Sequence, residues 1–175
     1  MRQIPLYSLV IFPNPEQITL IKSYKQLLRN NIGWFGSANA GAHITIINFD
    51  NEFSLQLHLD SIREFCKTAL PQKVTLNKFD SFGERTFFIA SDSASQHYLD
   101  NLIVGLHQYL DFKIQNTHAH LSIARGLDAQ KMKTAFELFR NTPINLEFNC
   151  NCFYLRRFGS RTKPGEECQN KIRNL

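Results

Sequence analysis

A short alternating pattern of polar and apolar residues occurs twice in this chain, once in each half of its 175 residues. The first copy reads His43-Ile44-Thr45-Ile46 and the second reads His120-Leu121-Ser122-Ile123. Alternate residues of a β-strand share a face, so each copy presents an imidazole and a hydroxyl on one face and two aliphatic side chains on the other. The repetition indicates two similar halves that face each other across a cleft.

The composition is that of a soluble globular protein, with 43% hydrophobic and 20% charged residues. Fifteen phenylalanines predict a core rich in aromatic packing. The apolar runs are too short for a membrane span, and the N-terminus lacks the features of a signal peptide, so we expect a cytoplasmic protein without a membrane partner. The four cysteines have no disulfide-framework spacing and are expected to be free thiols. The net charge of +5 favours an anionic ligand, although much of the excess lies near the C-terminus.

Hydrophobic periodicity and turn residues predict the order strand, helix, strand, helix, strand, strand, helix, strand, helix, strand, strand. Besides the two motif strands, we expect strands near 7–12, 73–79, 85–89, 144–148 and 152–155, and helices near 18–29, 54–70, 93–109 and after Asp128. Ser93 or Ser95 is expected to cap the third helix, and 80–84 to form the turn of a hairpin. Helices interleaved with hairpins favour an α+β fold with mainly antiparallel sheets. Residues 1–159 would form one domain, and 160–175 a basic, loosely ordered tail.

Two histidines that face each other suit a general acid and a general base, because imidazole titrates near working pH. Two neighbouring hydroxyls could donate hydrogen bonds to the non-bridging oxygens of a phosphate. No step of such a reaction requires a metal ion. The residues on which this hypothesis depends are His43, His120, Thr45 and Ser122.

At these residues the sequence resembles the 2H phosphoesterase superfamily, most closely its bacterial 2′-5′ RNA ligase-like branch, whose signature of histidine, apolar residue, threonine or serine, and apolar residue occurs twice. Trp34 lies a short loop ahead of the first motif, Ala124-Arg125 continues the second, and Phe79–Gly83 lies between them, as the family pattern has it. The resemblance spans about 7–157. It implies a bilobal LigT-like fold, in which two mainly antiparallel sheets with helices outside border a central groove.

The resemblance also implies a metal-independent phosphoesterase without a cofactor. It would hydrolyse 2′,3′-cyclic phosphates, or reversibly cleave and ligate 2′-5′ phosphodiester bonds, in RNA ends or nucleotides. By position, His43 and His120 would be the acid–base pair, and Thr45 and Ser122 would hold the phosphate. The sequence does not say which histidine is the base. A monomer is expected, because the groove is built within one chain.

Several alternatives remain open. The same groove could belong to a non-catalytic RNA- or nucleotide-binding protein. Trp34 could stack on a base or anchor the loop and core. Arg125 has an odd offset from both His120 and Ser122, so without a bulge it would lie on the opposite face, as a salt-bridge partner rather than a phosphate clamp. A zinc site is a further alternative if the strands that carry two histidines and two cysteines are adjacent. Its ligands would be His118, His120, Cys150 and Cys152.

Overall fold

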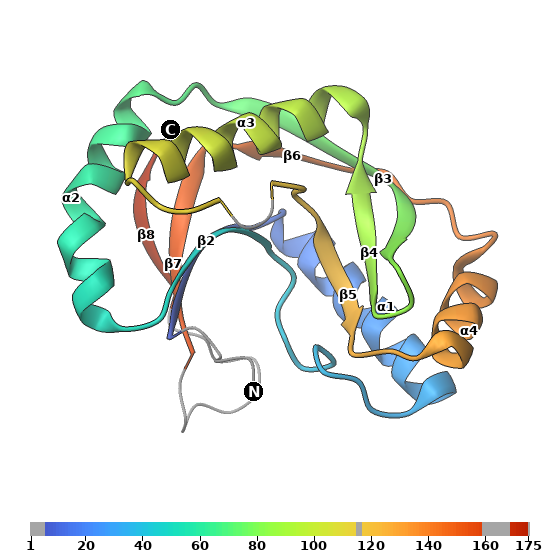
Figure 1. The fold of residues 1–175 in the computed structure, drawn as a ribbon. Coiled ribbons are helices and arrows are strands. Elements are labelled where there is room, and N and C mark those ends of the chain that lie inside the picture. Colours follow the sequence, from blue (N-terminus) through green and yellow to red (C-terminus); the bar gives the residue numbers. More distant parts are fainter. Residues whose placement is uncertain (1–5, 115–116, 159–168, 175) are drawn as a thin grey trace.

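The structure is a computed structural model that describes residues 6–114, 117–158 and, as backbone alone, 169–174. Within these ranges the helices are α1 (Pro15–Ile32), α2 (Glu52–Thr68), α3 (Ser93–Tyr109) and α4 (Ala129–Phe139). The strands are β1 (Tyr7–Ile11), β2 (Ile44–Phe49), β3 (Gln72–Phe82), β4 (Thr86–Ser91), β5 (Leu121–Arg125), β6 (Leu146–Cys150), β7 (Cys152–Arg157) and β8 (Gln169–Asn174). The predicted α+β class and the order of elements through β7 are confirmed (Figure 1).

The eight strands form one sheet in the order β6-β3-β4-β5-β2-β1-β7-β8, and every neighbouring pair is antiparallel. Two separate sheets are expected from the sequence; instead, two four-stranded halves join where Ile44 of β2 pairs with Leu121 of β5. The C-terminal region also differs from the expected loose tail, because 169–174 form β8 against β7. Residues 160–168 lie outside the described residues.

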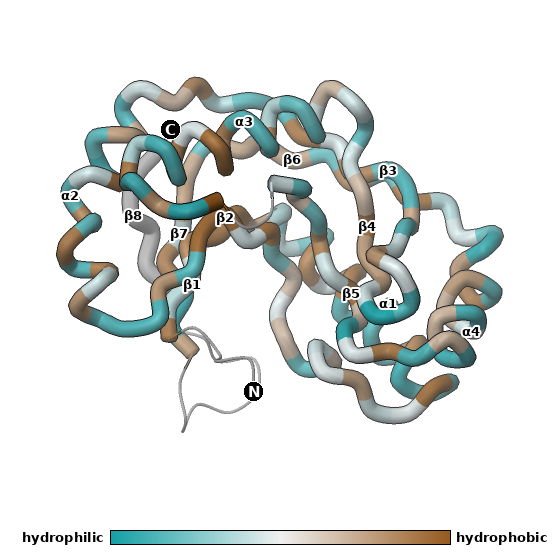
Figure 2. Tube along the Cα trace, in the orientation of Figure 1, coloured by the Kyte–Doolittle hydropathy of each residue, from teal (hydrophilic) through white to brown (hydrophobic). Residues whose placement is uncertain are grey.

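The helices pack against the sheet through apolar residues at helical spacing. Helices α1 and α4 contact each other and the half with β4 and β5, α2 contacts β2 and β8, and α3 contacts β2, β3 and β4 (Figure 1). Hydrophobic residues run along β2, the strand of the first half that pairs with the other half (Figure 2). Among the described residues, none of the helices has the length and apolar character needed to cross a membrane.

Three helix or strand ends differ from the prediction, and each difference has a local cause. Helix α1 begins at Pro15, three residues before the expected start near 18, since the fixed φ of proline suits the first helical position. Asp92 caps α3 through a 2.8 Å bond from Ser95 N, because the carboxylate precedes both serines. Strand β3 continues to Phe82, and the hairpin turns beyond it at Gly83, whose φ of 53° suits glycine. The predicted Asp128 cap of α4 is confirmed by a 2.8 Å bond from Lys131 N.

Candidate active site

The two histidine motifs meet at the junction between the sheet halves. Ile44 and Leu121, which pair across this junction, are fully buried. Paired residues of antiparallel strands share a face, so continuing this register by one residue sets each histidine opposite the hydroxyl residue of the other motif. The resulting opposed pairs are His43 with Ser122 and His120 with Thr45. All four side chains are half-buried and lie on the face opposite the aliphatic core, as the alternation predicts.

Both motif strands carry a β-bulge at the same position. The pairing of β1 with β2 skips Ile46, and the pairing of β4 with β5 skips Ile123. A bulge adds one residue, so residues beyond it exchange faces relative to simple alternation. Arg125 therefore lies on the same face as Ser122, which corrects the prediction made without a bulge. Its Nε donates a 3.0 Å hydrogen bond to the Oγ of Ser122.

The first half has an amide where the second has a guanidinium. Asn48 lies three residues after Thr45, as Arg125 lies three residues after Ser122. Ser8 of β1 pairs with Asn48, and its hydroxyl donates a 2.7 Å bond to Asn48 Oδ1. The duplicated halves therefore share a histidine and a hydroxyl, but at this position the second half alone supplies a positive charge.

Backbone carbonyls orient both imidazoles in the same way. His43 Nδ1 lies 2.8 Å from the carbonyl oxygen of Gly41, and His120 Nδ1 lies 2.9 Å from that of His118. A carbonyl oxygen can only accept, so each Nδ1 must carry a proton. In the neutral rings, Nε2 then carries the lone pair and is the nitrogen that can take up a proton.

Arg156 of β7 contacts the first histidine and was not identified from the sequence. Its Nη1 donates a 3.0 Å hydrogen bond to His43 Nε2, and its side chain is buried at 4% exposure. Phe158 lies under the guanidinium, 4.1 Å from ring centroid to Cζ. The sequence assigns this arginine to a basic C-terminal cluster. Its burial and its contact with His43 are visible only in the structure, because the two strands are joined through β1.

Both histidines are held in the neutral form. Burial, together with the adjacent Arg156 guanidinium, lowers the pKa of His43 to about 3. Burial also lowers the pKa of His120, against the opposing effect of the bond to the His118 carbonyl. An anion between the two rings would raise both pKa values, because a nearby negative charge favours the imidazolium.

The loop before the first motif is fastened to the second motif strand. Gly36 N donates a 2.9 Å bond to the carbonyl of Arg125, and the hydroxyl of Ser37 donates a 3.0 Å bond to the carbonyl of Ile123. A Cβ on Gly36 would lie 3.3 Å from the Arg125 oxygen, so glycine suits this close approach. The loop from one half thereby fixes the bulged segment of the other.

Lys25 of α1 also contacts this loop. It is 3% exposed, and its ammonium donates to the carbonyls of Ser37 and Ala40 at 3.1 and 2.8 Å. A buried ammonium needs such acceptors. Trp34, at the start of the loop, is 58% exposed, with the Arg29 guanidinium 5.0 Å from its ring centroid. The indole is therefore not part of the core.

The strands on which the alternative zinc site depends are not adjacent. Strand β5, which follows His118 and His120, is separated from β6 by β3 and β4, and from β7 by β2 and β1. Cys150 and Cys152, on those two strands, are free and buried, while Cys168 lies outside the described residues. Within the described part of the chain, histidine, cysteine and carboxylate side chains form no group of three that could hold a metal ion.

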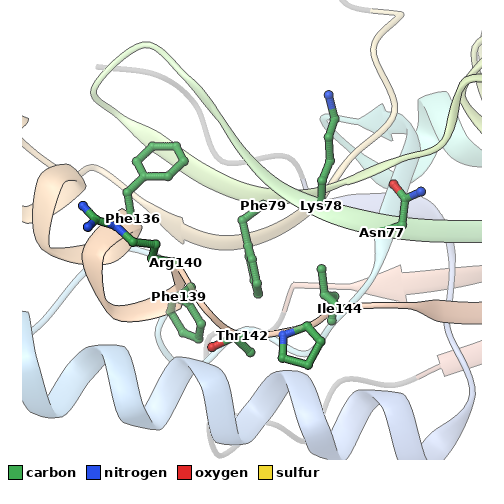
Figure 3. Close-up of a pocket in the computed structure, with 9 residues that line it drawn as sticks. Asn77, Lys78, Phe79, Phe136, Phe139, Arg140, Thr142 and Ile144 are labelled. Atoms are coloured by element: carbon green, nitrogen blue, oxygen red, sulfur yellow. The ribbon is translucent and has the colours of Figure 1, made fainter.

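A cavity of about 440 Å³ lies away from the motifs (Figure 3). It is bordered by β3, by the end of α4 and by the segment that follows α4. Phe79 points into it from the face of the sheet that carries the aromatic core, where its ring contacts Phe139 at a centroid distance of 4.9 Å. None of the motif residues lines this cavity.

The fold and the paired motifs are those of a 2H phosphoesterase. Residues 14–161 match the 2′-5′ RNA ligase superfamily, and the chain belongs to this family, whose members are phosphoesterases and ligases. A comparison with curated proteins finds no match.

Solved structures share the fold over 97–98% of this chain. Escherichia coli LigT complexed with 3′-AMP is 14% identical, with 98% of this chain and 97% of that chain covered and a TM-score of 0.63. TT0787 of Thermus thermophilus is 16% identical, with coverages of 97% and 96% and a TM-score of 0.55. Kluyveromyces marxianus Usb1 is 13% identical, with both coverages at 98% and a TM-score of 0.50. At these identities the likeness shows the fold alone.

Proposed function

We propose that this protein is a metal-independent phosphoesterase that hydrolyses 2′,3′-cyclic phosphates, or cleaves and rejoins 2′-5′ phosphodiester bonds, in RNA or nucleotides. The observation that carries the proposal is the register at the sheet junction, which opposes the two histidine–hydroxyl motifs on one face. Family membership supports the reaction class. Solved structures of LigT complexed with 3′-AMP, ATP and NADP+ support a nucleotide as the ligand.

In the proposed hydrolysis, the lone pair of one Nε2 removes a proton from water as the water oxygen bonds to phosphorus. The phosphorus–oxygen bond to the ribose then breaks, and the other imidazole, as imidazolium, protonates the leaving oxygen. The negative phosphate supplies the field that favours this imidazolium in a pair that is neutral in the free protein. The imidazoles make both proton transfers, so no step requires a metal ion.

The groups around the histidines would stabilise the transferred phosphate. The hydroxyls of Thr45 and Ser122 can donate to its non-bridging oxygens. Arg125 already bonds to the Ser122 hydroxyl, which orients the hydroxyl and brings a positive charge beside it. Arg156 supplies a second charge on the His43 side. Guanidinium groups suit this role because their fork of donors matches a phosphate.

The test is incubation of the purified protein with nucleoside 2′,3′-cyclic monophosphates in EDTA, with separation of the products. We expect a nucleoside monophosphate, and a loss of about 10²–10⁴-fold in kcat for His43→Ala and for His120→Ala. His97→Ala is the matched control, because His97 is exposed on α3.

Full activity in both motif variants would contradict the acid–base assignment. Binding of the cyclic phosphates and of 2′-5′-linked oligonucleotides without turnover would instead identify a binding protein that uses the same site. Activity lost in EDTA and restored by a divalent cation would contradict the metal-independent chemistry.

A further inference from the structure

The two sheet halves place different groups in equivalent positions beside the two histidines. Strand β1 pairs with the first motif strand and β4 with the second, with the same bulge in each pairing. Ser8 of β1 pairs with Asn48, and Thr86 of β4 pairs with Arg125, and each pair lies at the same distance from its bulge. Ser8 and Thr86 are therefore equivalent positions. The next strand outward puts Arg156 opposite Ser8 and Phe82 opposite Thr86. Arg156 and Phe82 are therefore equivalent by register, although one is a cation and the other an aromatic ring.

Each of these residues contacts the histidine of its own half. Arg156 donates to His43 Nε2 at 3.0 Å. The ring of Phe82 lies 4.8 Å from the ring of His120, centroid to centroid, and nearly perpendicular to it at 89°. At this pair of equivalent positions, His43 therefore has a charged neighbour that suits phosphate, while His120 has an apolar, planar one.

Phe82 is the outer ring of a fixed aromatic cluster. Its ring lies 4.3 Å from that of Phe88, which is 1% exposed, and 5.5 Å from the ring of His118. Phe82 itself is 37% exposed. The Phe82 ring is thus packed on one side, open to solvent on the other and next to His120. It presents a flat apolar surface, and its contacts already restrict its rotamers, so binding a ligand there would cost little further side-chain entropy.

We propose that Phe82 is the platform on which the nucleobase of the substrate stacks, so that the nucleoside lies on the His120 side and the phosphate charge lies toward Arg156 and Arg125. The proposal rests on the proposed function and names its substrate class: a ribose cyclic phosphate that carries a base. Every nucleobase has a flat π-face, so stacking on Phe82 would be tolerant of base identity.

The test compares two substrates that differ only in the base. One is adenosine 2′,3′-cyclic monophosphate, and the other is methyl β-D-riboside 2′,3′-cyclic phosphate, which has no base. The measured quantity is the ratio of their kcat/KM values in the wild type and in Phe82→Leu. Leucine keeps an apolar contact with Phe88 but has no flat ring. We expect the ratio to fall by about 5–100-fold in the variant, from the loss of base–aromatic stacking.

Phe136→Leu is the matched control, because Phe136 is a similarly exposed phenylalanine on α4, at 40%. Its ratio should equal that of the wild type. Thermal unfolding of each variant would show whether the fold is intact. Phe82→Tyr, which keeps a flat ring, should retain most of the preference for the base.

The outcomes separate the two proposals. If the wild type cleaves both substrates and Phe82→Leu has the wild-type ratio, the platform is wrong and the proposed function stands. If the wild type cleaves neither substrate nor a 2′-5′-linked dinucleotide, the proposed function is wrong, and the platform falls with it. An equal loss on both substrates would show that Phe82 supports His120 rather than a base, and would also overturn the platform.

Discussion

Replacing Arg156 with methionine tests whether its guanidinium holds His43 in the neutral form. Methionine keeps an unbranched side chain in the buried space and removes the positive charge 3.0 Å from His43 Nε2. Without that charge, protonation of His43 becomes easier, so its pKa rises from about 3 toward the ordinary histidine value. It should not rise fully, because burial, which is the larger cause, remains.

Burial is the larger cause of the lowered pKa of His43, so removal of the Arg156 charge should reverse only the smaller part of that shift. We expect the proton affinity of His43 to increase about tenfold, equivalent to about 1.4 kcal/mol. The same substitution removes a charge-assisted hydrogen bond that the proposed phosphate would receive, which costs about 1.5–3 kcal/mol. We therefore expect kcat/KM for a cyclic phosphate to fall about 10–150-fold.

Histidine ring nitrogen resonances, followed between pH 4.5 and 8, would measure the protonation directly. Arg157→Met is the control, since Arg157 is exposed at the next position of β7 and its removal changes the net charge equally. In the wild type and the control, His43 should stay neutral throughout this range. If the onset of protonation is the same in Arg156→Met as in the control, the guanidinium is not what keeps His43 neutral.

Three further predictions follow from other contacts of the site. Ser122→Ala and Arg125→Met should each lower kcat/KM about tenfold or more, with a coupling energy of about 0.5–3 kcal/mol in a double-mutant cycle, because the two side chains share a hydrogen bond. Lys25→Met removes the donor to two loop carbonyls and should destabilise the fold by about 1–3 kcal/mol, measured as a fall in melting temperature of about 2–12 °C. Folding lowers the pKa of His43 and His120, so the unfolded chain binds more protons below about pH 6.5, and the melting temperature should fall as the pH is lowered from 6.5 toward 4.

Each of these predictions has an outcome that contradicts it. Strict additivity of the Ser122 and Arg125 variants would mean that their hydrogen bond does not matter in the reaction. Lys22→Met, at an exposed position of the same helix, should leave the melting temperature within about 1–2 °C, corresponding to about 0.5 kcal/mol. An equal loss in both lysine variants would remove the assigned role of Lys25. A melting temperature that rises as the pH falls would show that the histidines gain protons more readily in the folded chain.

Residue alternation was sufficient to predict the faces of the residues in the two motifs. It placed each histidine with a hydroxyl on one face, and the burial of Ile44 and Leu121 on the opposite face agrees with this. Alternation failed at Arg125, because a bulge leaves no mark in the pattern of apolar residues: Ile123 is apolar whether or not it is an extra residue. A one-residue change in pairing reverses the face of everything that follows.

Arg156 could not be placed from the sequence for a different reason. It lies 113 residues from His43, and the two meet only because β7 pairs with β1 and β1 with β2. Its neighbours in sequence are basic, so it resembled part of a solvated tail. The zinc alternative depended on the same kind of information, because it required β5 to lie beside β6 or β7, and the sheet order separates them.

The duplicated plan also explains where the site departs from symmetry. The proposed hydrolysis has an attacking oxygen and a leaving oxygen, so in this mechanism the two imidazoles would differ in role although their motifs are alike. Differences in role require different neighbours. The register supplies these at equivalent positions: an amide and a guanidinium three residues beyond the hydroxyls, and a guanidinium and an aromatic ring two strands further out. The positions that are alike in the two halves thus hold the histidines and hydroxyls proposed for the chemistry. The positions that differ between the halves are where the orientation of the substrate would be set.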